Sequence, residues 1–136
     1  MSLDPYLFFD GDCRAALAFY AAVFQTEPSG VMAYAQAPGF DPADPSADRV
    51  LYASLPIGGV TAMLSDVPVG QPYVSGNHVA LSFGTPDPAE AERVFAALAD
   101  GGHVHMPLAP TFFNPLYGML TDRFGVMWMV SQTPPG

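Results

Sequence analysis

One apolar helix pattern occurs twice in this chain, and this repeat limits the possible folds more than any other feature. In CRAALAFYAAVF, four apolar residues stand at i, i+3, i+4 and i+7, the spacing of a single helix face. They are Ala16, Phe19, Tyr20 and Val23. In AEAERVFAALADGG the same face recurs with each residue 75 positions later. These residues are Ala91, Val94, Phe95 and Leu98. The repeat predicts two modules of the same architecture.

One β-like run precedes each helix pattern and three follow it. In the first half these runs are PYLFF, VMAYAQA, VLYASL and VTAMLS, with the PIGG turn joining the last two. In the second half they are HVALSF, HVHMPL, PLYGMLT and VMWMVS. We therefore predict an α+β fold in a single domain over residues 1–136. Its two β-α-β-β-β modules span about residues 1–66 and 76–133, with the boundary inside residues 66–76.

The helix ends carry capping signals. Asp12 stands where the first helix would begin, and Asp87 stands three residues before Glu90 at the start of the second. Gly101 follows the second helix, where a glycine commonly ends a helix. We expect Asp12 and Asp87 to be the N-caps of the two helices.

Alternation along the strands predicts which side chains share a sheet face, because residues i and i+2 point the same way. In HVALSF the bulky Val79, Leu81 and Phe83 are expected to lie beneath the helix, which leaves His78 on the opposite face with two small residues. The same reasoning places Trp128 on the helix side of VMWMVS and leaves two methionines on the other side. The sequence therefore predicts a ligand pocket lined by both modules.

The charge composition excludes several kinds of partner. The formal net charge is −9, with no lysine and only four arginines, so we expect no binding to nucleic acid. An acidic surface favours an apolar or cationic ligand over an anionic one. No apolar run is long enough for a membrane span, and the N-terminal segment lacks the features of a secretion signal. With Cys13 as the single cysteine, we expect a cytoplasmic protein that does not associate with membranes.

Three quoted segments carry a resemblance to a known family. YLFFDGDCRAALAFY, GNHVALSF and GMLTDRFGVMWMV resemble the PhnB-like family of the glyoxalase/bleomycin-resistance/extradiol dioxygenase (vicinal oxygen chelate) superfamily, and the likeness covers nearly the whole chain. The resemblance implies paired β-α-β-β-β modules that form a cupped, partly closed mixed sheet with helices on its outer face. It also implies a ligand cavity and, commonly, a homodimer.

The resemblance further implies where a metal would bind. In metal-dependent members, the first and the last strand of each module each supply one ligand, usually His or Glu. Those positions here are Pro5, Met63, His78 and Met129. Proline offers no side-chain donor and thioethers suit hard divalent ions poorly, so only His78 keeps a conventional ligand. We expect no metal centre of the glyoxalase type and no cofactor.

Two functions stay open at this point. The first is a small-molecule-binding protein without the metal centre. The second is a metal-independent or weakly metal-dependent enzyme, a lyase, isomerase or dioxygenase-like protein, with His78 as general base. The predicted ligand-lining residues are Leu7, Phe9, Met63, His78, Phe112, Phe113, Tyr117, Met127 and Met129.

Other chemically notable residues have structural explanations that we favour. His103 and His105 share a strand face, which allows a two-histidine metal clamp, but no third ligand is nearby in the sequence, so we expect a solvated edge strand instead. Cys13 lies in the first turn of a helix, and we expect a structural cysteine rather than a nucleophile. Asp122 and Arg123 are expected to be solvent-facing turn residues.

Overall fold

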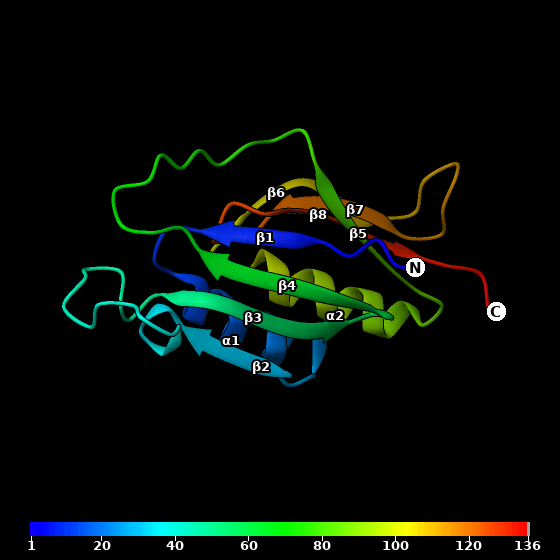
Figure 1. The fold of residues 1–136 in the computed structure, drawn as a ribbon. Helices are drawn as coiled ribbons and strands as arrows, with labels where there is room; N and C mark the ends of the chain where they lie inside the picture. The colour runs from blue at the N-terminus through cyan, green and yellow to red at the C-terminus, as the bar shows by residue number, and fades with distance from the viewer. Residues whose placement is uncertain (136) are drawn as a thin grey trace. The chain divides into compact units, whose positions relative to one another are not determined.

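The chain folds into two compact units with the same order of elements. The structure is a computed structural model that describes residues 1–135 (Figure 1). The first unit is Met1–Val74, and the second begins at Ser75. Each unit has one four-stranded mixed sheet and one long helix in the order β-α-β-β-β. The predicted α+β fold built of two such modules is confirmed.

The first sheet has the strand order β1-β4-β3-β2. Its elements are β1 (Tyr6–Phe9), α1 (Cys13–Phe24), β2 (Gly30–Ala33), η1 (Tyr34–Gln36), β3 (Val50–Ile57) and β4 (Val60–Asp66). β1 runs parallel to β4, whereas the other neighbouring pairs are antiparallel. Helix α1 packs against β3 and β4, and Figure 1 shows it running along one face of this sheet.

The second sheet repeats this topology with the order β5-β8-β7-β6. Its elements are β5 (Ala80–Thr85), α2 (Pro88–Ala99), β6 (His103–Ala109), β7 (Tyr117–Thr121) and β8 (Met127–Gln132). β5 runs parallel to β8, and α2 packs against all four strands. We call the face of each sheet that carries no helix of its own unit the open face.

The helix faces that form the cores agree closely with the predicted repeat. All four predicted residues of α2 are buried. In α1 the buried residues include Leu17 in place of the predicted Phe19, which is only half-buried. Both apolar side chains fit the helical spacing, so the pattern could not distinguish them. Burying one such side chain contributes roughly 1.5–3 kcal/mol, so these helix faces hold each module together.

Several strand boundaries differ from the prediction, and two of them matter for the site. The strand expected over VMAYAQA ends at Ala33, where a register shift interrupts the pairing with β3 and a short 3-10 helix follows. There the side chain of Gln36 accepts a hydrogen bond from the Ala33 N–H at 2.6 Å, which replaces ladder pairing. The strand expected to start at His78 begins two residues later, at Ala80. Val79, predicted to lie beneath the helix, therefore precedes the strand and is 69% exposed.

Candidate functional site

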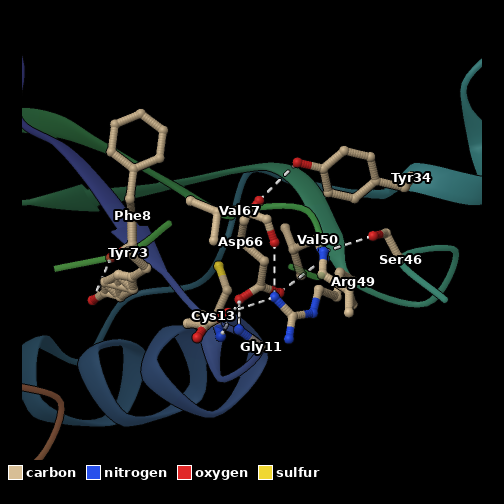
Figure 2. Close-up of polar contacts among 12 residues, drawn as sticks. Phe8, Gly11, Cys13, Tyr34, Ser46, Arg49, Val50, Asp66, Val67 and Tyr73 are labelled. Carbon is tan, nitrogen blue, oxygen red and sulfur yellow. Dashed lines mark hydrogen bonds and ion pairs between the residues drawn. The ribbon is translucent and has the colours of Figure 1, made fainter. Parts of the chain in front are cut away.

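A buried carboxylate organises the end of the first sheet (Figure 2). Asp66 is the last residue of β4 and is 2% exposed. Its Oδ1 accepts hydrogen bonds from the backbone N–H groups of Gly11 at 2.8 Å and Cys13 at 3.0 Å. Its Oδ2 accepts one from the N–H of Val50 at 3.0 Å. This single side chain therefore joins β4 to the β1–α1 turn and to the start of β3.

The Asp66 contacts correct the predicted cap of α1. Asp12 occupies the N-cap position, but its side chain makes no capping hydrogen bond. The carboxylate at this helix N-terminus is instead supplied by Asp66, 53 residues further along than Cys13. In α2 the predicted cap is correct, because Asp87 accepts a hydrogen bond from the Ala89 N–H at 3.0 Å. The N-terminus of α1 is thus already occupied by a negative group of the chain itself.

Cys13 lies next to the Asp66 carboxylate, to which its backbone N–H donates. Its side chain is fully buried, and burial, together with the nearby charge of Asp66, raises the pKa of the thiol to about 12. A thiolate is the nucleophilic form of cysteine, and at neutral pH this residue stays protonated. The complete burial of the thiol and its raised pKa agree with the structural role expected for Cys13.

All four arginines of the chain are engaged with acceptors in the structure. Arg49 forms an ion pair with Asp10 at 2.8 Å and also donates to the carbonyl of Val67. Arg14 donates to a backbone carbonyl. The two other ion pairs are Arg93–Glu90 and Arg123–Asp100. An anionic ligand would therefore have to compete with existing partners for each guanidinium.

The open face of the first sheet is aromatic. Tyr6 and Phe8 are two residues apart on β1 and share one face, and the centroids of their rings lie 4.8 Å apart. Tyr6 is the register partner of Met63 on β4, whose side chain is half-buried. The predicted ligand residues Leu7 and Phe9 alternate with Tyr6 and Phe8, and Phe9 is 1% exposed. In place of Leu7 and Phe9, the residues of β1 on the open face are therefore Tyr6 and Phe8.

The open face of the second sheet is rich in methionine. Burial alternates along β8, where Trp128 is buried on the helix side and Met127 and Met129 are half-buried on the open face. The same alternation on β7 puts Met119 on the open face, opposite Met129 across the strands. The sequence analysis placed Met127 and Met129 on this face but missed Met119.

The loop that precedes β7 is held by hydrogen bonds between its own residues, and it carries two phenylalanines next to this face. Phe112 is fully exposed and Phe113 is 57% exposed, and their rings lie 5.1 Å apart. Phe113 contacts the ring of Tyr117 at 5.0 Å, and the Tyr117 hydroxyl donates to the sulfur of Met129 at 2.9 Å. The hydroxyl of Thr111 accepts from two backbone N–H groups of the same loop, so its shape is locally fixed. Within the second unit, four of the predicted ligand residues thus form one continuous chain of contacts.

His78 lies outside the strands. It is exposed, in the segment that precedes β5. Among the other positions where the resemblance implies metal ligands, Pro5 accepts the Met63 N–H through its carbonyl at 2.9 Å and offers no side-chain donor. Met63 and Met129 are thioethers. These residues do not fit a centre for a hard divalent ion, because one imidazole cannot hold such an ion by itself.

The histidine pair on β6 belongs to an edge strand, as the sequence suggested. The rings of His103 and His105 lie 4.8 Å apart, and His105 Nε2 is 2.7 Å from the hydroxyl of Thr121. Within residues 1–135, no group of three or more His, Cys, Asp or Glu side chains is arranged to hold a metal ion.

Asp122 is not the solvent-facing turn residue that was predicted. It is buried, and its carboxylate accepts hydrogen bonds from the N–H groups of Phe124 and Val126 and from the indole of Trp128 at 2.9 Å. Its neighbour Arg123 binds Asp100 across the end of α2. The tight turn leaves these donors inside the fold, so a carboxylate is needed to satisfy them.

Comparisons with known proteins agree with this architecture. Residues 2–130 match the model of the Glyoxalase/Bleomycin resistance protein/Dioxygenase superfamily. The chain is 31% identical to protein YjdN of Escherichia coli K12, over 96% of this chain and 95% of that protein. The chain therefore belongs to the glyoxalase/bleomycin-resistance/dioxygenase superfamily, in its PhnB-like family.

Two solved structures are similar over almost the whole chain. Protein PA1353 of Pseudomonas aeruginosa is 38% identical, covers 99% of both chains and gives a TM-score of 0.89. A PhnB protein of Bacillus cereus, described as a putative 3-demethylubiquinone-9 3-methyltransferase, is 25% identical, with a TM-score of 0.82 over 98% of this chain and 100% of that one. Both structures share the fold of this chain, and the second supports the PhnB-like assignment.

Proposed function

We propose that this protein binds a small organic molecule and does so without a divalent metal centre. The observation that carries the proposal is the open face of the second sheet, where Met119, Met127 and Met129 adjoin Tyr117 and the exposed Phe113. Methionine side chains adapt to irregular apolar surfaces, and aromatic rings add large, rigid contact areas. Binding, rather than catalysis by the exposed His78, is the function that this arrangement supports best.

The ligand is expected to be apolar or cationic. None of the strands of the second sheet contains an Asp, Glu, Lys or Arg residue. The faces of Tyr117 and Phe113 attract a cation through the ring quadrupole, whereas the arginines that would favour an anion are already paired. A phosphonate or a nucleic-acid backbone is therefore not an expected partner.

A ligand screen by thermal shift, with and without EDTA or added divalent ions, tests this function. Ligands of the expected class should raise the melting temperature equally in both conditions, because binding to the folded state alone is stabilising. Each hit is then repeated on Phe113→Ala and on Val60→Ala, which removes an exposed apolar side chain from the β3–β4 hairpin. The shift should shrink only in Phe113→Ala. A screen in which every stabilising compound is anionic, or in which stabilisation requires a divalent ion, would contradict the proposal.

Elemental analysis tests the metal-free part separately. Protein purified without chelator should hold well under one equivalent of nickel, zinc, iron or manganese per chain, because His78 is the sole conventional donor among the four family ligand positions. His78→Ala should leave that metal content unchanged, whatever its effect on ligand affinity. One tightly held ion per chain that is lost in His78→Ala would refute this view.

We also propose that the protein is a cytoplasmic homodimer. β2 and β6 are edge strands, and an unpaired sheet edge on a chain with few charges favours self-association. Sedimentation should report twice the 14.4 kDa mass of the chain, and a monomer at micromolar concentration would count against the dimer. No helix within residues 1–135 is both long enough and apolar enough to cross a membrane.

A further inference from the structure

Methionines gather in one region of the second sheet. The chain has seven methionines, and four of them lie on three adjacent strands. Met106 on β6 is the register partner of Met119 on β7, which in turn is the partner of Met129 on β8. Met127 precedes Met129 by two residues and shares its face.

The spacing of the strands allows three of these methionine side chains to reach a common point. Directly opposite residues on neighbouring strands have Cβ atoms about 4.5–5.5 Å apart, and residues i and i+2 on one strand are separated by roughly 6.5–7 Å. Met119, Met127 and Met129 therefore stand at the corners of a small triangle on the open face. Their side chains are unbranched and flexible, so the three thioethers can converge.

The surroundings of the triangle contain imidazole nitrogen and hydroxyl oxygen donors. Thr121 is the register partner of both Met127 and His103, and its hydroxyl lies 2.7 Å from His105 Nε2. A register shift between Val104 and Met106 marks a bulge beside His105. The strands of this sheet carry no carboxylate, so a hard ion such as Mg²⁺ or Ca²⁺ finds none of its preferred ligands.

From this arrangement we infer that the open face of the second sheet binds one soft monovalent cation, Cu(I), through the thioethers of Met119, Met127 and Met129. Thioether donors select Cu(I) over the hard divalent ions. The hydroxyl of Tyr117 engages one lone pair of the Met129 sulfur and leaves a second for coordination. A net charge of −9 raises the local concentration of any cation. This site goes beyond the proposed organic ligand and does not depend on it.

The thiol of Cys13 would ordinarily be the strongest competitor for such an ion. In the folded chain it is fully buried and stays protonated at neutral pH, as described above. Soft-ion binding to the native protein should therefore report on the methionines.

Titration of the wild-type protein with Ag(I), a redox-stable substitute for Cu(I), tests the site by NMR of methionine methyl groups labelled with ¹³C. With one equivalent of Ag(I), the methyl signals of Met119, Met127 and Met129 should move and then saturate. The signals of Met63 and Met32 should stay in place, and Met32 is a stringent control because it is 44% exposed on the first sheet. Shifts that follow solvent exposure, with Met32 included, would overturn the inference, as would the absence of any shift.

A Cu(I) competition assay with bicinchoninate tests the same site independently. The nearly isosteric double variant Met127→Leu/Met129→Leu should weaken Cu(I) binding at least tenfold, whereas Met32→Leu should not change it. Binding that survives in the double variant and disappears in Cys13→Ala would assign the ion to the thiol and refute the inference. The organic-ligand screen contains no copper, so it can fail or succeed without affecting this result.

Discussion

Replacing Asp66 by alanine should destabilise the protein strongly. The substitution removes the acceptor of three backbone N–H groups, those of Gly11, Cys13 and Val50. The bonds to Cys13 and Val50 are buried, whereas Gly11 lies near the surface, where water can replace the lost acceptor. An unsatisfied buried donor costs about 1–3 kcal/mol, so two of them should lower the free energy of unfolding by about 4 kcal/mol.

Asp66→Asn should have about half this effect. Its carbonyl oxygen can still accept from Gly11 and Cys13, but its NH₂ group then faces the N–H of Val50. One buried donor is left without an acceptor, which corresponds to about 2 kcal/mol.

Urea denaturation followed by far-UV circular dichroism measures both effects. Asp10→Ala is the matched control, because Asp10 is a 53% exposed carboxylate whose ion pair with Arg49 should contribute less than about 1 kcal/mol. Trp128 is the single tryptophan and lies in the second unit, so its fluorescence shows whether that unit unfolds at the same urea concentration. A loss of stability in Asp66→Ala no greater than that in Asp10→Ala would refute this role of the Asp66 carboxylate.

Four further outcomes follow from the structure. The Cys13 thiol should resist labelling by a disulfide reagent until the protein is unfolded in urea; rapid labelling of the native protein would contradict its burial. Because the folded-state pKa of this thiol is about 12 and its ordinary value is 9.0, the unfolded chain loses the proton first, so the free energy of unfolding should fall as the pH rises above 9. Asp122→Asn should cost about 1–3 kcal/mol in urea denaturation and change the emission of Trp128, whose indole it binds; unchanged stability and emission would count against that contact. Glu90→Gln breaks a partly exposed pair with Arg93 and should shift the urea midpoint very little, so a large shift would show that this pair matters more than its geometry implies.

The two helix N-termini show which features of the fold could be predicted from the sequence. The cap of α2 is local: Asp87 accepts the N–H of Ala89 two residues later, and a short motif reveals it. The cap of α1 comes from Asp66, which nothing in the neighbouring sequence indicates. Contacts between residues close in sequence leave a pattern, whereas a contact that depends on the completed sheet does not. The buried role of Asp122 was missed although its partners are local, because a turn aspartate is usually exposed.

The assignment of sheet faces succeeded in β8 and failed for Val79, which is 69% exposed and precedes β5. In β8 the large Trp128 and Val130 are buried, as predicted, and the methionines between them are on the open face. In β1 all four residues are apolar or aromatic, so the sequence YLFF contains no signal that separates Tyr6 and Phe8 from their neighbours. The side to which a strand of this composition turns is decided by packing against the helix, which forms only in the folded module.

The net charge of the chain and the donor groups on the open face of the second sheet favour different ligands for the proposed site. The donor groups determine which of the attracted molecules this face could hold. The excess of acidic residues acts over a distance and favours the approach of any cation. At contact, however, the open face of the second sheet offers thioethers, a phenol ring and imidazoles, with no carboxylate on its strands. A small hydrated cation such as Mg²⁺ would be attracted and then find no oxygen ligands able to replace its water. A cation that is itself soft or organic loses little by leaving water and gains contacts with sulfur and aromatic rings. If a ligand binds at this face as proposed, the acidic composition favours the approach of a cation, and the uncharged face favours weakly hydrated cations and apolar molecules at contact.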